Sequence, residues 1–89
     1  MEIKKLAFAG TLESSDAYVV VKPGTEGIRI DLNSVVSQQF GDAIREVIRD
    51  VLRELDVENA DIDVIDKGAL DCVLRARVET AVLRGKEEA

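Results

Sequence analysis

The strongest signal for the fold lies in residues 17–32, which read AYVVVKPGTEGIRIDL. Residues 17–22 are mostly β-branched or aromatic, and this composition predicts a β-strand. Residues 27–32 alternate apolar and polar side chains, which predicts a second strand with one buried face. Pro23 and Gly24 lie between them and are typical of a turn, since proline fixes φ and glycine tolerates a positive φ. We therefore predict that the two strands form a β-hairpin.

A helix is predicted after this hairpin, with Asn33 or Ser34 as its N-cap. Acidic residues precede arginines by three positions on its outer face, in the pairs Asp42/Arg45, Glu46/Arg49 and Asp50/Arg53. The interleaved acids favour a solvated face over a phosphate-binding arginine row. The apolar residues fall on one helical stripe: Phe40, Ile44, Val47, Ile48, Val51, Leu52 and Leu55.

The remainder of the chain predicts further strands. Residues 60–65 alternate again and predict a third strand, and Lys67 and Gly68 form a turn. Residues 70–83 fit both an alternating strand and a helical stripe, and we favour a strand over residues 71–79. The expected fold is α+β, a two-layer sandwich in ββαββ order. One long amphipathic helix covers a mostly antiparallel sheet of about four strands. Residues 1–89 form a single domain with a disordered tail at 86–89.

Composition excludes several classes of function. The chain has 89 residues, no histidine and one cysteine, so a serine–histidine triad, an internal disulfide and a CxxC metal site are excluded. The net charge of −6 argues against nucleic acid or a membrane as partner. Neither a long apolar run nor a signal-peptide pattern is present. We therefore expect a cytoplasmic protein.

The net charge is concentrated in residues 54–66, which contain six acids and no base. Two interpretations stay open, a solubilising edge and a docking surface for a basic partner. A calcium loop is disfavoured, because the glycine and the bidentate glutamate of such loops are missing. The candidate docking residues are Glu54, Asp56, Glu58, Asp61, Asp63 and Asp66.

Residues 9–16, AGTLESSD, are rich in hydroxyl groups and precede the first predicted strand. The pattern alone is typical of a turn. No nearby residue is suited to activate a serine as a nucleophile. An exposed serine without a base can still accept a group that another enzyme installs, because this needs only an accessible loop.

This serine segment resembles the N-terminal motif of the citrate lyase acyl carrier family, the γ subunit. The similarity extends over nearly the whole chain, and its two long blocks, residues 10–16 and 66–79, are specific. The Ala-Gly-Thr-Leu-Glu-Ser-Ser motif favours this family over the related carrier subunit of malonate decarboxylase. The matching segments are residues 9–16, 31–32, 39–42, 66–72 and 75–81.

The resemblance implies that Ser14 carries a covalently attached 2'-(5''-phosphoribosyl)-3'-dephospho-CoA, installed by a separate prosthetic-group transferase. Glu13, Ser15 and Asp16 would be its neighbours in the loop. Chemistry alone does not separate Ser14 from Ser15, and the motif position selects Ser14. The thiol of the arm would hold acetyl as a thioester. The citrate lyase α subunit would exchange acetyl for citryl, and the β subunit would release oxaloacetate. The chain itself would be a non-catalytic carrier in a cytoplasmic complex of citrate-fermenting bacteria.

A second class of function stays open from the residues alone. The chain could be a small regulatory or assembly subunit that binds a partner through its sheet, with an unmodified serine loop. A stand-alone enzyme is poorly supported, because no acid–base constellation converges. Cys72 alternates with Leu70 and Leu74 in the predicted strand, so we expect it to be buried rather than to act as an acyl-carrying thiol.

Overall fold

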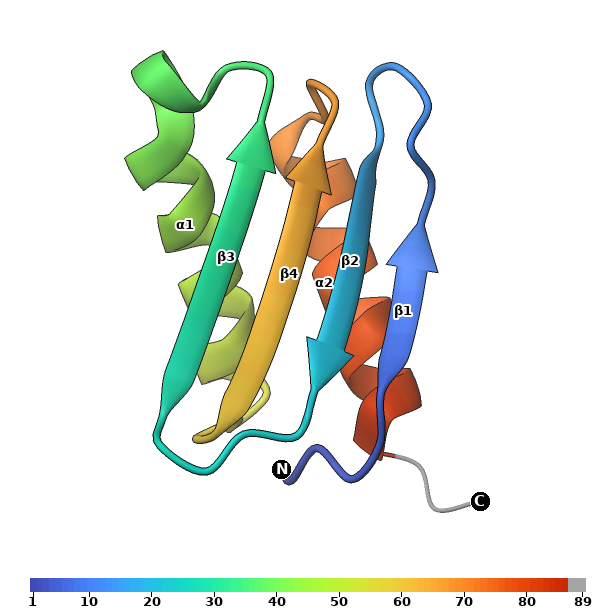
Figure 1. The fold of residues 1–89 in the computed structure, drawn as a ribbon, viewed down its shortest axis with the longest axis vertical. Coiled ribbons are helices and arrows are strands. Elements are labelled where there is room, and N and C mark those ends of the chain that lie inside the picture. The colour runs from blue at the N-terminus through green and yellow to red at the C-terminus, as the bar shows by residue number, and fades with distance from the viewer. Residues whose placement is uncertain (87–89) are drawn as a thin grey trace.

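The computed structural model describes residues 1–86, which form a four-stranded sheet with two helices packed against it (Figure 1). The α+β class and the two-layer arrangement predicted from the sequence are confirmed. The elements in chain order are β1 (Ala7–Gly10), β2 (Ala17–Lys22), β3 (Ile28–Ser34), α1 (Ser37–Glu54), β4 (Ala60–Asp66) and α2 (Asp71–Lys86).

The sheet order is β1-β2-β4-β3, so β4 lies between the two strands predicted to pair as a hairpin. The hairpin prediction is wrong. β2 pairs with β4 in antiparallel fashion, whereas β3 pairs with β4 in parallel through the α1 crossover. The connection between β2 and β3 passes around the start of β4: Ala60 donates its N–H to the Gly27 carbonyl at 3.0 Å. A Cβ on Gly24 would lie 2.9 Å from the Ala60 nitrogen, so this close passage requires glycine.

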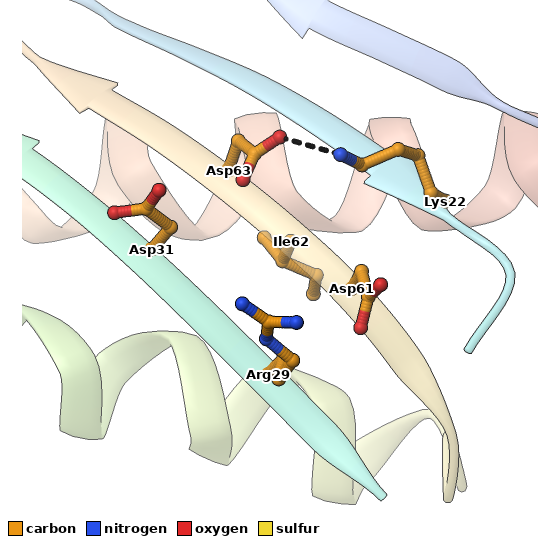
Figure 2. Close-up of a pocket in the computed structure, with 6 residues that line it drawn as sticks. All are labelled: Lys22, Arg29, Asp31, Asp61, Ile62 and Asp63. Atoms are coloured by element: carbon orange, nitrogen blue, oxygen red, sulfur yellow. Dashed lines mark ion pairs between the residues drawn. The ribbon is translucent and has the colours of Figure 1, made fainter. Parts of the chain in front are cut away.

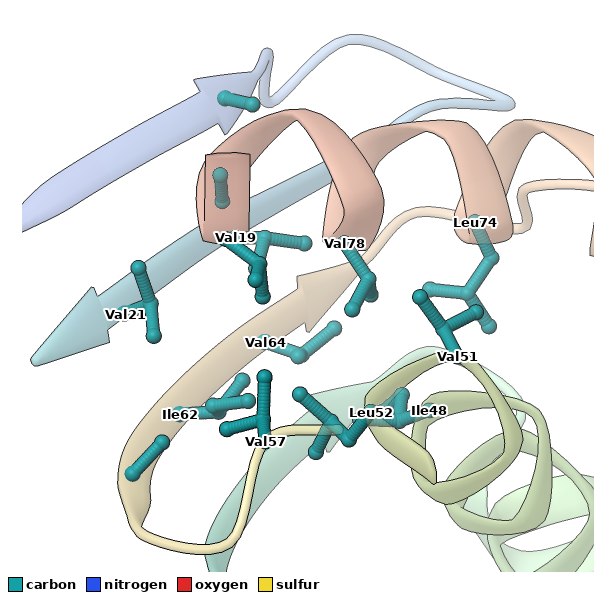
Figure 3. Packing of buried hydrophobic residues seen from close by; sticks show 14 of the residues in the cluster. Val19, Val21, Ile48, Val51, Leu52, Val57, Ile62, Val64, Leu74 and Val78 are labelled. Atoms are coloured by element: carbon teal, nitrogen blue, oxygen red, sulfur yellow. The ribbon is translucent and has the colours of Figure 1, made fainter. Parts of the chain in front are cut away.

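Both helices cover the same face of the sheet and leave the other face open (Figure 1). The buried side chains alternate along the strands, with Val19 and Val21 on β2 and Ile62 and Val64 on β4 all at most 1% exposed. They pack against α1 and α2 in one continuous core (Figure 3). Full burial of each such aliphatic side chain contributes about 1.5–3 kcal/mol. This core fixes the strands that carry the loops at either end.

Residues 71–86 form the helix α2, so the strand predicted over 71–79 is wrong. Leu74, Val78, Ala81 and Val82 are buried at helical spacing, because they face the sheet, whereas an edge strand there would bury alternate residues. Cys72 is exposed, and its predicted burial is also wrong. Lys86 is the last residue of α2 rather than part of a disordered tail. Residues 87–89 lie outside the described part of the chain.

The helix α1 agrees with most of its predicted pattern. Ile44, Ile48, Val51 and Leu52 are buried in the core, but Phe40 in the first turn is 52% exposed. The predicted acid–base pairs form, with N···O distances of 3.8, 3.8 and 2.8 Å.

The predicted N-cap of α1 is wrong. Val36 occupies that position without a side-chain hydrogen bond. Asn33 and Ser34 instead belong to β3, because their backbone pairs with β4.

Candidate functional site

Ser14 lies in the loop of residues 11–16 that joins the adjacent antiparallel strands β1 and β2. We call this segment the serine loop. The Ser14 side chain is exposed, and its hydroxyl has no hydrogen-bond partner within residues 1–86. The serine loop, the β4–α2 turn and the β3–α1 connection lie at the same end of the sheet (Figure 1). The hydroxyl is therefore accessible, while the ends of its loop are anchored in the sheet.

The Asp16 carboxylate ties the serine loop to the body of the domain. The Thr11 hydroxyl donates to Asp16 Oδ2 at 2.7 Å. Arg77 on α2 donates twice, from Nε to Oδ1 at 2.9 Å and from Nη2 to Oδ2 at 2.8 Å. The Asp16 side chain is only 13% exposed. These bonds, those from Arg77 first, hold the pKa of Asp16 well below its ordinary value, and the same contact raises the pKa of Arg77.

Backbone contacts join the serine loop to the β4–α2 turn. Ser15 donates its N–H to the Lys67 carbonyl at 2.8 Å, and Lys67 donates its N–H to the Asp16 carbonyl at 2.9 Å. Ser15 adopts a left-handed φ of 65°, a conformation that non-glycine residues adopt infrequently. A Cβ on Gly10, at the start of the loop, would lie 1.8 Å from the Ala17 carbonyl oxygen. The loop shape is thus imposed by its surroundings, while the Ser14 side chain takes no part in these contacts.

Asp66 supports the same turn from inside the molecule. It is 2% exposed, and its carboxylate accepts hydrogen bonds from the Ser34 hydroxyl at 2.7 Å and from the Ala69 N–H at 2.9 Å. A buried carboxylate held in this way fixes the turn that contacts the serine loop. Its burial removes Asp66 from the candidate docking surface.

The remaining acids of residues 54–66 are distributed over several parts of the surface. Glu54 pairs with Arg75 at 2.6 Å, which joins α1 to α2. Asp56 and Glu58 are exposed between α1 and β4. Asp61 and Asp63 lie on the open face of β4, where Asp63 pairs with Lys22 at 3.0 Å.

Figure 2 shows Asp61 and Asp63 beside Asp31 and Arg29 of β3, in a depression on the open sheet face. Two of the six acids therefore share an exposed face with further charges from a neighbouring strand. Sequence reasoning did not include Asp31 or Arg29 among the candidate docking residues, because it assigned their strand a different neighbour.

Sequence reasoning also missed Arg77 and Lys67 as parts of the serine site. Arg77 is separated from Asp16 by 61 positions along the chain. The strand predicted over residues 71–79 also gave no indication that the Arg77 side chain would contact the serine loop. The available signal was that Lys67 and Arg77 both belong to the specific block of resemblance at residues 66–79.

The site offers an exposed hydroxyl and no imidazole to act as its general base, since the chain contains no histidine. Across the described residues, no group of three or more potential ligands is arranged to hold a metal ion. In the same part of the chain, no helix has the length and apolar character needed to cross a membrane. The arrangement can present a covalently attached group at the exposed Ser14 hydroxyl.

Comparison with known proteins gives a consistent result. The family described as "ACP: Malonate decarboxylase delta subunit (MdcD)" matches residues 4–85. "Citrate lyase acyl carrier protein 2" of Salmonella typhimurium is 55% identical over 99% of this chain and 92% of its own length. "Citrate lyase acyl carrier protein" of Oenococcus oeni is 52% identical over 94% of this chain and 87% of its own length.

A solved structure shares the fold. It is a chain of a Pseudomonas malonate decarboxylase hetero-tetramer in complex with malonate, with a TM-score of 0.64 and 23% identity. The match covers 94% of this chain and 87% of that one.

Proposed function

The chain belongs to the acyl carrier family of the malonate decarboxylase delta subunit and the citrate lyase acyl carrier proteins, and we propose that it is the acyl carrier subunit of a citrate lyase. It is a carrier rather than a catalytic enzyme. The observation that carries the proposal is the exposed, unpartnered Ser14 hydroxyl on a loop whose neighbours are fixed. A carrier needs such a hydroxyl and needs no acid–base residues beside it.

The proposed modification is 2'-(5''-phosphoribosyl)-3'-dephospho-CoA, joined to Ser14 through a phosphodiester. The residues present suit such a group, because the Ser14 hydroxyl is accessible and the backbone around it is held by Asp16 and Arg77. When bound, the group would supply the thiol that holds acetyl and citryl as thioesters. The chain positions the attachment point and keeps it open to solvent. The fixed geometry of the loop would be the chain's own contribution to the reaction.

The proposed partners are the citrate lyase α subunit, which would transfer the acyl group, and the β subunit, which would cleave the citryl group. A separate transferase would modify Ser14, and the complex would work in the cytoplasm. Two catalytic partners must be reached from one attachment point, and a tethered arm gives a high effective concentration at both. The half-buried acids Asp61 and Asp63 on the open face of the sheet are the proposed docking contacts.

The decisive experiment for the modification is an intact-mass measurement. We expect the chain, co-expressed with the transferase, to gain the mass of one prosthetic group. Ser14→Ala should abolish the gain completely, because the accepting oxygen is removed. Ser15→Ala is the matched control and should keep the gain, since that serine stays outside the phosphodiester. A Ser14→Ala chain that still gains the mass would overturn the assignment. An unmodified chain that still assembles with its partners would favour the regulatory or assembly role.

The docking proposal is tested by charge reversal of Asp61 and Asp63 to lysine. We expect slower association with the α or β subunit, with the difference shrinking as salt is added, because screening weakens long-range attraction. Reversal of Glu46 and Asp50 on the outer face of α1 is the control, since it changes the net charge equally on the other side of the domain. Equal association rates for both variants across a salt series would contradict docking at the sheet.

A further inference from the structure

The open face of the sheet is divided into an apolar part and a charged part. The register places Tyr18 beside Ile65, and Val20 between Phe8 and Asp63. Phe8 is 54% exposed, and its ring centroid lies 5.9 Å from that of Tyr18, with the rings tilted by 41°. We call Phe8, Tyr18, Val20 and Ile65 the aromatic corner. It contains two of the three aromatic residues of the chain and no charged side chain.

The aromatic corner adjoins the serine loop. Tyr18 is the second residue of β2 and is four positions from Ser14, so their Cα atoms are at most about 14 Å apart. Its neighbour on β1 is Gly10, which has no side chain to cover the tyrosine ring from that strand. Leu12, within the loop itself, is 57% exposed. A group attached to Ser14 therefore begins next to this apolar surface.

The charged part of the open face restricts where an anionic arm can lie. It consists of Lys22 and Arg29 with three acids, Asp31, Asp61 and Asp63 (Figure 2). Lys22 is already engaged with Asp63. The excess of carboxylates repels phosphate groups from this half of the face. The aromatic corner carries no charge of its own, and the acid that borders it, Asp63, is paired with Lys22. It offers ring faces, on which nucleobases stack irrespective of their identity.

We propose that the aromatic corner is a resting site for the adenine of the arm carried on Ser14. This inference rests on the proposed function and adds the chain's own binding surface for the arm. Weak stacking suffices, because the tether supplies a high local concentration of the base. The same weakness lets the arm leave for a partner's active site. Four side chains form a much smaller surface than the roughly 20–30 residues a side of a stable protein interface, which favours the base over a second protein as occupant.

The test is a comparison of the aromatic resonances of the modified chain with those of the unmodified Ser14→Ala chain by NMR. The three aromatic residues make assignment direct. We expect ring-current shifts and cross-relaxation with adenine protons at Phe8 and Tyr18. Phe40 is the internal control, because it is exposed on α1, which lies on the covered side of the sheet (Figure 1); its resonances should stay unchanged.

Tyr18 fluorescence, measured in two phenylalanine variants, gives a second test. Tyr18 is the single tyrosine in a chain without tryptophan, so its fluorescence reports on this surface alone. We expect weaker Tyr18 fluorescence in the modified chain, and recovery of the signal in modified Phe8→Ala but not in modified Phe40→Ala. Because Phe8 is half exposed, its removal should leave the fold intact.

The possible results separate this inference from the proposed function. A chain whose mass shows the arm but whose Phe8 and Tyr18 resonances do not move overturns the resting site and leaves the carrier role intact. Equal shifts at all three aromatic rings, or shifts that depend on protein concentration, also overturn it, the latter by pointing to a protein partner on this face. A chain that gains no mass overturns both proposals.

Discussion

The two faces of the sheet are built from alternate residues of the same strands and differ sharply. On β4, Ile62 is 1% exposed beneath the helices, whereas Asp63 is half-buried on the open side and pairs with Lys22. The covered face holds small aliphatic side chains, and the open face mixes aromatic and charged ones. The comparison indicates that stability depends on one face, which leaves the other free for contacts with the arm and with partners.

The largest expected effect comes from matched substitutions on β4, where two isoleucines point to opposite faces. Ile62→Ala removes a fully buried side chain and should destabilise the domain by about 2–5 kcal/mol. Ile65→Ala, on the open face, should cost less, because its side chain is already in partial contact with water. Urea unfolding of both variants measures the difference. Equal losses would mean that the two faces contribute alike to stability.

A smaller and local effect is expected from Arg77→Gln, which removes the guanidinium that holds Asp16 ionised. The pKa of Asp16 should rise toward the ordinary value of about 3.9. A carboxylate whose pKa is lowered in the folded state stabilises the domain at pH values above its unfolded-state pKa. This stabilisation is lost as the pH falls through its folded-state pKa, so the variant should lose it. NMR titration of the Asp16 carboxyl and exchange of the Ser15 amide should report the change.

Arg75→Gln is the control for this variant, because Arg75 lies on the same helix but pairs with Glu54. It should leave the Asp16 titration unchanged. An Arg77→Gln chain with an unaltered Asp16 pKa would show that the serine loop is held without α2.

The smallest expected effect is that of Cys72→Ser. Cys72 is exposed in the first turn of α2, and exposed substitutions of this kind change stability within about 0.5 kcal/mol. The same exposure predicts fast reaction of the native thiol with a bulky reagent. Slow reaction, or a large loss of stability, would place Cys72 in the core after all.

The sequence identifies the elements of the fold better than their arrangement. The alternation in β3 and β4 and the stripe of α1 are local patterns, and all three elements form. The neighbours of β2 depend on contacts with β4 that a turn at Pro23 and Gly24 does not encode. The element β1, with four residues, is too short to give a clear pattern. Residues 71–79 alternate apolar and polar side chains, but this alternation does not reflect a strand. The segment forms a helix because its apolar residues at helical spacing pack against the sheet.

The candidate site likewise has a part that the sequence predicts and a part that depends on the tertiary fold. The motif around Ser14 is contiguous, so resemblance was sufficient to single out that residue. The residues that shape the loop are not contiguous with it: Lys67 and Arg77 approach only through the tertiary fold. The aromatic corner also depends on the register of three strands. A pattern of single residues along the chain carries no information on such neighbours.

The insertion of β4 between β2 and β3 has a consequence for the order of events during synthesis. The serine loop leaves the ribosome early, but its contacts with Lys67 and Arg77 require residues made much later. The strand β4, one of the two inner strands of the sheet, is likewise made after β1, β2, β3 and α1. The serine loop can therefore take its fixed shape only after Lys67 and Arg77 have been made.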